Sequence, residues 1–333
     1  MVTDAATPTR SSGAVQSAVV SGAGVIVAFV AAILYLAALS PHSILSGVDA
    51  ALGVPSVAVS IIFFAVVLVA AVSRLAGARY GRGWYVGLVV VTAVGTVFQI
   101  LVVVTNVSWF SIVLVILAVA ALILAIRSGR TDTVDAPQRA ADDSPLALGI
   151  FLILAGLAGL TASMNLTFDD VNSKTTGAAQ SCDFSLFVQC SKNLGSWEGS
   201  LFGFPNPLIG LGAFTVPLVI GIAILFGATF RRWFWIAFNL GVVFALAFVI
   251  FLIGTSIYVL GTLCLWCALV WTFTIPMFWS LSLYNLKTGN IRVSPRATKF
   301  FASALTWVPL ITLVSYIVVA VLFQARLNVL QYL

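Results

Sequence analysis

The chain contains little charge and almost no histidine. Of its 333 residues, 8% are Asp, Glu, Lys or Arg and 61% are hydrophobic, and His42 is the single histidine. A soluble domain carries about 25% charged residues, and no second ligand accompanies His42 to complete a metal site. The composition therefore predicts an integral membrane protein and argues against a histidine-bound metal.

Long apolar runs fill most of the chain. Because a membrane-spanning helix needs roughly 20 apolar residues, we expect an all-α membrane protein with about nine such helices. The predicted spans are 21–39, 56–73, 84–104, 109–126, 146–164, 207–228, 233–253, 262–284 and 300–323. The run from Trp233 to Leu283 is too long for one helix, so we expect a hairpin that turns near Gly254 and Gly261.

The positive charges predict the orientation of these helices. Of the 16 Lys and Arg residues, all but Lys174, Lys192 and Arg326 fall in segments that a cytoplasmic N-terminus would place inside the cell, as the positive-inside rule requires. We therefore expect a multi-pass protein of the plasma membrane, surrounded by lipid. The basic residues are scattered over short turns and form no basic face, so no nucleic-acid partner is expected.

Polar segments divide the chain into regions. Residues 127–145 are polar and of mixed charge, which is typical of a cytoplasmic linker. This linker separates a cysteine-free, four-span region at 21–126, whose role the sequence does not indicate, from a five-span region at 146–323. Residues 1–20 are predicted to be a disordered cytoplasmic tail, and 324–333 form a C-terminal tail.

The longest outward segment is expected from about Asn165 to Pro205. Its second half, from Cys190 on, is rich in Gly, Phe, Trp and Pro, which predicts that it folds back onto the membrane surface. For residues 165–180, a flexible connector stays open as the alternative interpretation.

All four cysteines lie in the C-terminal region, on the predicted outer side. Cys182 and Cys190 lie in the outward segment, where we expect them to be exposed to water, and Cys264 and Cys267 form a Cys-Leu-Trp-Cys motif at the start of the eighth span. A C-x-x-C pair at a helix start can open and close a disulfide, and disulfides persist outside the cytoplasm. The pattern predicts thiol redox chemistry.

Two other uses of these cysteines must be weighed. A nonenzymatic membrane protein with two structural disulfides would explain Cys182 and Cys190 well, but it explains a C-x-x-C at a helix start poorly. A zinc site would need a more regular spacing than this one, so no metal is expected. Four cysteines allow three pairings, and the spacing leaves the pairing open.

If both pairs are redox-active, they form an electron relay. Electrons would pass from an external thiol protein to the loop pair, then to the C-x-x-C pair, and then to an oxidant inside the membrane. A quinone fits this last role because it dissolves in the bilayer and accepts two electrons, the number that a dithiol releases.

Four motifs then identify a family. The chain carries, in this order, Cys182-Asp183-(x6)-Cys190, Ser196-Trp197, Phe204-Pro205-Asn206-Pro207-Leu208-Ile209-Gly210 and Cys264-x-x-Cys267. This order resembles the vitamin K epoxide reductase family, including its bacterial members, over about residues 146–323. The resemblance implies a helix bundle that is capped by the loop and holds a quinone, menaquinone or ubiquinone. It also implies a DsbA-like or thioredoxin-like partner outside the cytoplasm, expected to be a separate protein because no soluble stretch is long enough for a fused domain.

The resemblance also implies roles for the cysteines. Cys182 would exchange with the partner, and Cys190 would pass the electrons to Cys264. Cys267, deeper in its helix, would face the quinone.

Three further residues match positions near the quinone in the family. Asn206 would donate a hydrogen bond to a quinone oxygen, although capping of the helix that begins at Pro207 is an equal interpretation from the residues alone. Ser196 would order the cap over the site. Trp271 stands where vertebrate members carry a tyrosine that contacts the quinone, so we expect quinone reduction and not epoxide turnover.

Overall fold

The computed structural model describes residues 56–75, 82–105, 109–131, 145–177, 179–185 and 187–327, with five further positions among the first 26 residues. Apart from those positions, the predicted span at 21–39 and the tail at 1–20 lie outside the described residues. Within them, the only β pairing is an isolated parallel bridge between Val188 and Leu263. The protein is all-α, as predicted.

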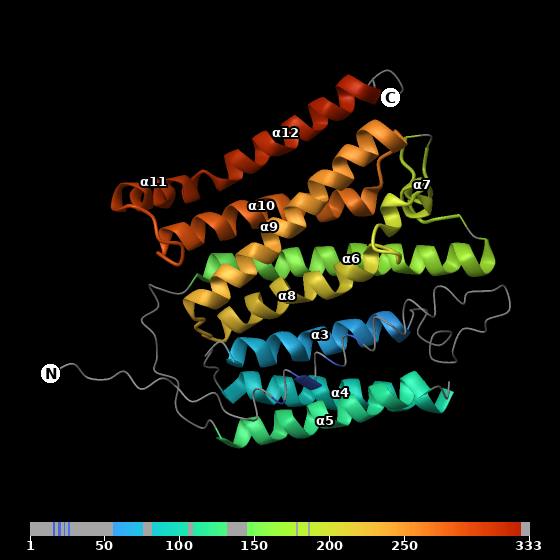
Figure 1. The fold of residues 1–333 in the computed structure, drawn as a ribbon, viewed down its shortest axis with the longest axis vertical. Coiled ribbons are helices and arrows are strands. Elements are labelled where there is room, and N and C mark those ends of the chain that lie inside the picture. Colours follow the sequence, from blue (N-terminus) through green and yellow to red (C-terminus); the bar gives the residue numbers. More distant parts are fainter. Residues whose placement is uncertain are drawn as a thin grey trace.

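Long helices lie side by side and make up nearly all of the described structure (Figure 1). They are α3 (Ser56–Leu75), α4 (Arg82–Thr105), α5 (Trp109–Thr131), α6 (Leu146–Thr176), α8 (Pro207–Leu225), α9 (Arg232–Thr255), α10 (Leu265–Lys287) and α12 (Val308–Leu327). Shorter elements connect them: α7 (Cys190–Gly195), η2 (Glu198–Ser200), the π-helical η3 (Ser256–Leu260) and α11 (Pro295–Thr306).

Six of these helical segments are long and apolar enough to cross a membrane. They are Val86–Val104, Leu146–Thr176, Pro207–Leu225, Arg232–Leu260, Leu265–Lys287 and Val308–Leu327, and two shorter apolar helices cover Ala58–Ser73 and Ser111–Ile126. Each helix satisfies its own backbone hydrogen bonds, as a lipid environment requires. The prediction of a multi-pass membrane protein is confirmed, but the count of nine spans is not confirmed by the described residues.

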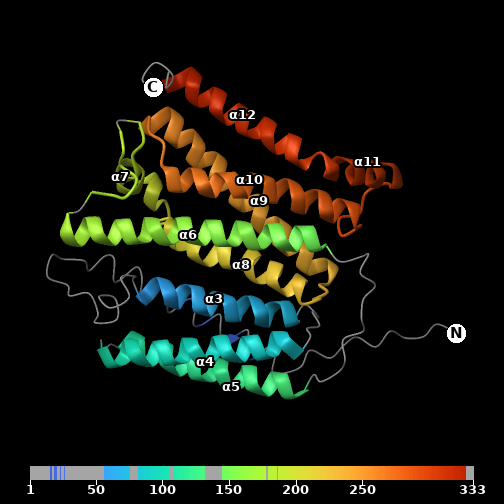
Figure 2. The same ribbon diagram turned by 180° about the vertical axis from the view of Figure 1, so that it is seen from behind.

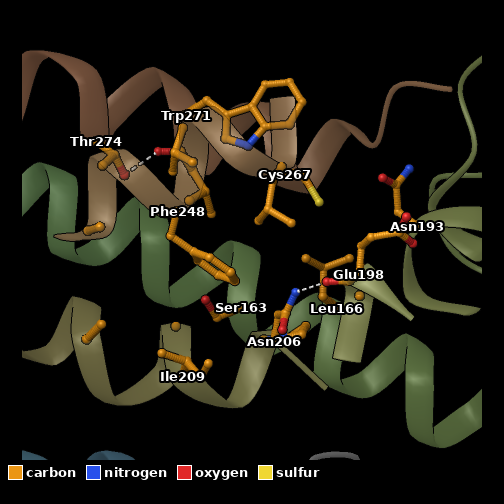
Figure 3. Close-up of a pocket in the computed structure, with 18 of the residues that line it drawn as sticks. Ser163, Leu166, Asn193, Glu198, Asn206, Ile209, Phe248, Cys267, Trp271 and Thr274 are labelled. Carbon is orange, nitrogen blue, oxygen red and sulfur yellow. Dashed lines mark hydrogen bonds between the residues drawn. The ribbon is translucent and has the colours of Figure 1, made fainter. Parts of the chain in front are cut away.

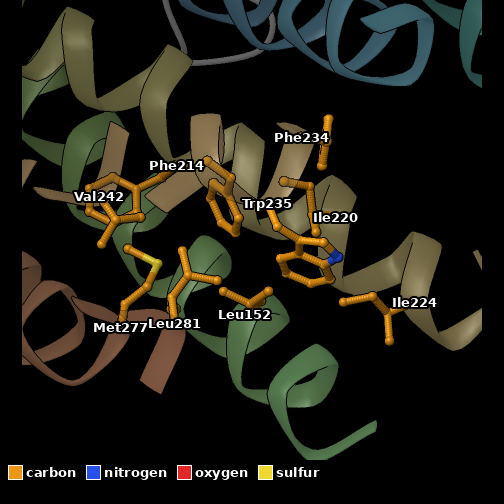
Figure 4. Close-up of a cluster of buried hydrophobic side chains, with 11 residues drawn as sticks. Leu152, Phe214, Ile220, Ile224, Phe234, Trp235, Val242, Met277 and Leu281 are labelled. Atoms are coloured by element: carbon orange, nitrogen blue, oxygen red, sulfur yellow. The ribbon is translucent and has the colours of Figure 1, made fainter. Parts of the chain in front are cut away.

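The core of the C-terminal half lies between α6, α8, α9 and α10 (Figure 4). Leu152 of α6, Ile220 of α8 and Leu281 of α10 are almost completely buried there. Helices α6 and α8 approach so closely that a Cβ at Gly156 would lie 2.7 Å from the backbone nitrogen of Leu218. Small residues permit such close packing of membrane helices. The four helices form a bundle, and α7 and η2 lie at one of its ends (Figure 1).

The N-terminal helices pack on one side of this bundle. In both ribbon views, α3 lies between the bundle and the pair α4 and α5 (Figures 1 and 2). Phe64 of α3 packs in one cluster with Leu208 and Leu211 of α8. Gln99 of α4 donates a hydrogen bond to the hydroxyl of Ser60 on α3 at 2.9 Å. On the opposite side of the bundle, α12 packs against α10.

Two predicted boundaries are wrong. Helix α6 continues to Thr176, so residues 165–176 are helical and not a flexible connector; a Lys174–Asp170 ion pair at 2.7 Å supports this extra length. The predicted span at 300–323 is divided between α11 and α12, which meet at Trp307. Pro309 explains the break, because proline lacks the N–H that a continuous helix would use.

Candidate functional site

A short backbone pairing places Cys190 beside Cys264. The bridge joins Val188 to Leu263, and the N–H of Gln189 donates to the carbonyl of Leu263 at 3.1 Å. Cys190 then begins α7, and Cys264 directly precedes α10. Their Sγ atoms lie 3.0 Å apart, and both side chains are completely buried. Two cysteines that are 74 positions apart in the chain therefore lie within reach of thiol–disulfide exchange.

The structure contains one disulfide and one dithiol. Cys182 is bonded to Cys190, with their Cα atoms 5.7 Å apart, and Cys264 and Cys267 are free thiols. The Sγ atoms of Cys182, Cys190 and Cys264 all lie within 4.8 Å of one another. Three such sulfurs could bind a soft metal ion, but a disulfide removes two of them as thiolate ligands. The arrangement therefore matches one stage of exchange between the two pairs.

Asp183 fixes the loop between the two bonded cysteines. Its Oδ1 accepts the backbone N–H of Cys190 at 2.7 Å and that of Ser191 at 3.1 Å. These are free N–H groups in the first turn of α7, so Asp183 caps the helix from outside it. The Asp that follows Cys182 in the sequence motif thus orients Cys190.

The C-x-x-C motif begins α10, as the sequence predicts. Cys264 occupies the N-cap position, and its Sγ accepts the backbone N–H of Cys267 at 3.3 Å. Cys267 lies one turn inside the helix. The motif therefore presents one sulfur to the loop and the other to the interior of the bundle.

A cavity of about 180 Å³ lies next to Cys267, between α6, α8, α9 and α10, with α7 and η2 at its outer end (Figure 3). It is lined mainly by apolar side chains, and the predicted residues Ser196, Asn206, Cys267 and Trp271 all line it. In Figure 3, Cys267 and Trp271 on α10 lie across the cavity from Asn206. The structure thus brings one thiol and three of the predicted binding residues to a single pocket.

Asn206 and Trp271 each present a buried polar atom to this pocket. The Nδ2 of Asn206 donates to the backbone carbonyl of Glu198 at 2.7 Å, whereas its Oδ1 has no partner among the described residues. Although Asn206 precedes α8, its side chain makes no capping bond to the first turn of that helix. Trp271 is 5% exposed, and its Nε1–H also lacks a partner in the described part of the chain. Because buried unpaired groups are costly, such atoms are typical of ligand sites.

These features fit a quinone. An apolar ring with two carbonyl oxygens needs an apolar pocket and hydrogen-bond donors. The lining is apolar, Trp271 offers its N–H, and Asn206 keeps a second Nδ2 hydrogen beyond the one that Glu198 accepts. When bound, a quinone would supply a two-electron acceptor beside Cys267.

Ser196 shapes the segment that covers the pocket. Its Oγ donates to the carbonyl of Asn193 at 2.8 Å and accepts the N–H of Gly199 at 3.1 Å. A Cβ at Gly199 would lie 2.1 Å from that carbonyl, so the turn requires glycine. The hydroxyl thereby joins α7 to η2, and η2 carries the carbonyl that binds Asn206.

Several other residues line the pocket but stand outside the four sequence motifs, among them Ser163, Asn193, Glu198 and Thr274. Thr274 had a detectable signal, because Cys267, Trp271 and Thr274 are spaced i, i+4, i+7 and so share one helix face. The others come from three different elements, and their meeting depends on the tertiary fold.

The expectation that the loop pair is exposed to water is wrong. Cys182 is 2% exposed, and Cys190 is fully buried. Both pack in a small cluster with Leu166 and Cys264, which Trp266 helps to cover. The loop folds onto the end of α6, and this removes both sulfurs from solvent.

The comparisons with known proteins agree with this site. The model of the vitamin K epoxide reductase family matches residues 150–282, a segment that contains all four cysteines and the pocket but not α3, α4 or α5. Comparisons with curated proteins and with solved structures gave no match. The family match, the buried disulfide and the long apolar helices together indicate a membrane redox protein. Over residues 150–282, the chain is similar to the vitamin K epoxide reductase family.

Proposed function

We propose that the protein is a membrane thiol–disulfide oxidoreductase that supports disulfide formation outside the cytoplasm. It passes two electrons from a separate DsbA-like or thioredoxin-like protein through Cys182/Cys190 and Cys264/Cys267 to menaquinone or ubiquinone in the membrane. The observation that carries this proposal is the 3.0 Å separation of the Cys190 and Cys264 sulfurs, next to a pocket that Cys267 lines.

The first step is exchange with the partner. A partner thiolate attacks Cys182, which forms a mixed disulfide and releases Cys190 as a thiolate. The second thiolate of the partner then attacks the partner sulfur of that mixed disulfide and releases Cys182. The partner leaves oxidised, and Cys182 and Cys190 have gained two electrons and two protons.

The second step is exchange between the pairs. The thiolate of Cys190 attacks Cys264 of an oxidised Cys264–Cys267 pair and releases Cys267. Cys182 then attacks Cys190, re-forms the loop disulfide and releases Cys264. The product has the pairing of this structure, with Cys182 bonded to Cys190 and a dithiol at the C-x-x-C motif.

The last step returns Cys264 and Cys267 to a disulfide. Two electrons and two protons leave this pair for the acceptor in the pocket. Trp271 and Asn206 would hold the acceptor by donated hydrogen bonds, and the apolar lining would exclude water. Cys267 is the sulfur placed to act there, because it lines the pocket.

The proposed orientation puts the cysteines outside the cytoplasm and the N-terminus inside. The cysteine loop lies at one end of α9 and α10, and Arg232, Lys287 and Arg292 lie at or near their other end. Arg232 donates to the carbonyl of Asn290 at 2.6 Å, which ties the basic turns together. The positive-inside rule assigns that end to the cytoplasm.

The rival interpretation is a nonenzymatic protein with two structural disulfides. The buried Cys182–Cys190 bond fits it, but two free thiols, one of them 3.0 Å from the Cys190 sulfur, do not. Trapping of free thiols under mild reductant separates the two: exchanging disulfides are expected, and four cysteines that never exchange would favour the rival.

The test of the proposal is anaerobic incubation of the purified protein with a reduced thioredoxin-like protein and menaquinone, with quinol formation followed optically. Ubiquinone in a parallel reaction distinguishes the two acceptors. Quinol formation that needs all four cysteines is expected. A protein that is folded but forms no quinol with either acceptor would contradict the proposal.

A further inference from the structure

The two cysteines of the loop disulfide are held in different ways. Cys190 is fixed by the backbone bridge and by Asp183. Cys182 follows Ser181, whose backbone N–H and hydroxyl both donate to Oδ2 of Asp169 on α6, at 3.2 and 2.6 Å. The indole N–H of Trp266 donates to the same hydroxyl at 3.1 Å. We call Asp169, Ser181 and Trp266 the latch.

The latch joins three parts of the site. Asp169 lies on the outer extension of α6 and is 7% exposed, so its carboxylate accepts charge-assisted bonds from a largely buried position. Trp266 lies between the two cysteines of the C-x-x-C motif. Ser181 itself is exposed, yet the next side chain, Cys182, is 2% exposed. The latch therefore lies at the boundary between the buried sulfurs and water.

The two exchange steps make opposite demands on Cys182. Attack by a partner requires the Cys182 sulfur to face water, whereas exchange with Cys264 requires it within reach of Cys190. A buried Cys182 satisfies only the second demand. Because Cys190 is fixed in place, the segment that carries Cys182 is the part that must move.

We propose that the latch sets the position of Cys182, closed for exchange between the pairs and open for exchange with the partner. This rests on the proposed function, in which Cys182 is the partner-facing cysteine. Asp169 is thus a positioning residue and takes no part in electron transfer. In the closed state the Cys182 thiolate attacks Cys190 of a Cys190–Cys264 bond and releases Cys264. In the open state a partner thiolate attacks Cys182 and releases Cys190.

The first test measures access to the loop disulfide without partner or quinone. In a Cys264→Ala, Cys267→Ala background, dithiothreitol reduces the Cys182–Cys190 bond and becomes a cyclic disulfide, and alkylation with mass analysis follows the rate. Asp169→Asn is expected to speed this reduction about tenfold, which corresponds to about 1.4 kcal/mol of lost latch free energy. Ser181→Ala should also speed the reduction, and this substitution changes neither a charge nor a residue of a helix.

Asp170→Asn is the matched control. It makes the same chemical change at the next position of α6, but Asp170 pairs with Lys174 and is buried to a similar extent. In this variant, dithiothreitol should reduce the Cys182–Cys190 bond at the same rate as in the protein with an unmodified latch. Equal rates for Asp169→Asn, Ser181→Ala and Asp170→Asn would overturn the latch.

A second test measures how often Cys182 lies close enough to Cys190 to form a bond with it. With Cys267→Ala alone, Cys190 can bond either Cys182 or Cys264, and peptide mapping gives the ratio. Opening the latch by Ser181→Ala should raise the Cys190–Cys264 share, because Cys182 is less often close to Cys190; an unchanged or lower share contradicts the proposal. Neither test uses the partner or a quinone. A negative result therefore contradicts the latch without contradicting the electron relay, and the absence of quinol formation contradicts the relay without contradicting the latch.

Discussion

Asn206 and Trp271 show how single residues make this pocket a candidate quinone site. Each buries a polar atom for which the described residues provide no partner, and both line the cavity beside Cys267. Such a group lowers stability unless a ligand pairs with it. Replacing either residue should therefore lower turnover and ligand binding without lowering the stability of the fold.

Asn206→Ala should lower quinone turnover by roughly a hundredfold or more, because a donor aimed at a developing charge in a dry site contributes about 2.7–4 kcal/mol. Thiol exchange between the cysteine pairs should remain normal. Quinone kinetics and thermal unfolding of the variant are the measurements, and Asn165→Ala, at a half-buried position of α6 that does not line the pocket, is the control. A destabilised but fully active Asn206→Ala protein would remove this residue from the site.

Trp271→Phe keeps the ring but removes the N–H. We expect quinone binding to weaken by up to about tenfold, the effect of one neutral hydrogen bond, with little change in unfolding temperature. Quenching of tryptophan fluorescence or a direct binding titration measures this. Trp307→Phe serves as the control because Trp307 is exposed at the start of α12; equal affinities in both variants would argue against the indole as a donor.

At the scale of elements, the site depends on how α6, α8 and α10 are placed. The four motifs allow the sequence to predict the cysteine helix, the pocket residues and the bundle, because each motif keeps its residues close together in the chain. The burial of Cys182 was not predictable, since it depends on α6 continuing to Thr176 and presenting Asp169 to Ser181. Pro309 is a sequence signal for the break between α11 and α12. The residues on both sides of it are apolar, however, and so predict one continuous span.

Gly156→Val should destabilise the bundle by about 1–3 kcal/mol, because its side chain would meet the Leu218 backbone. A Cβ there would lie 2.7 Å from the Leu218 nitrogen. Thermal unfolding in detergent measures the loss. Gly87→Val on α4 is the control, since no described atom outside its own turns of helix lies within 4 Å of the added Cβ. Equal unfolding temperatures for the two variants would show that α6 and α8 do not need this close approach.

At the scale of the whole molecule, the family region accounts for the cysteines and the pocket, and α3, α4 and α5 lie beside it. The family match begins at residue 150, after these helices. The contacts of α3 with α8 are apolar, as in the cluster of Phe64 with Leu211. Helices α3, α4 and α5 lie on the side of the bundle away from α12, and the proposed electron path from loop to pocket does not pass through them.

The orientation of the whole chain can be tested with single-cysteine reporters in a background that lacks the four native cysteines. Phe184→Cys, in the exposed part of the loop, should react with an impermeant maleimide in intact cells. Thr288→Cys, exposed after α10, should react only in inverted vesicles. Labelling of Thr288→Cys in intact cells would reverse the proposed topology.

The most direct test of the relay is anaerobic quinol formation by three proteins with two donors. The unmodified chain should form quinol from both a reduced thioredoxin-like protein and dithiothreitol. Cys182→Ala should fail with the protein donor but work with dithiothreitol, because loss of the Cys182–Cys190 bond loosens the loop that buries Cys264 and lets this small dithiol reach it. Cys267→Ala should form no quinol with either donor. Normal quinol formation by Cys267→Ala, or an equal loss with both donors in Cys182→Ala, would contradict the relay.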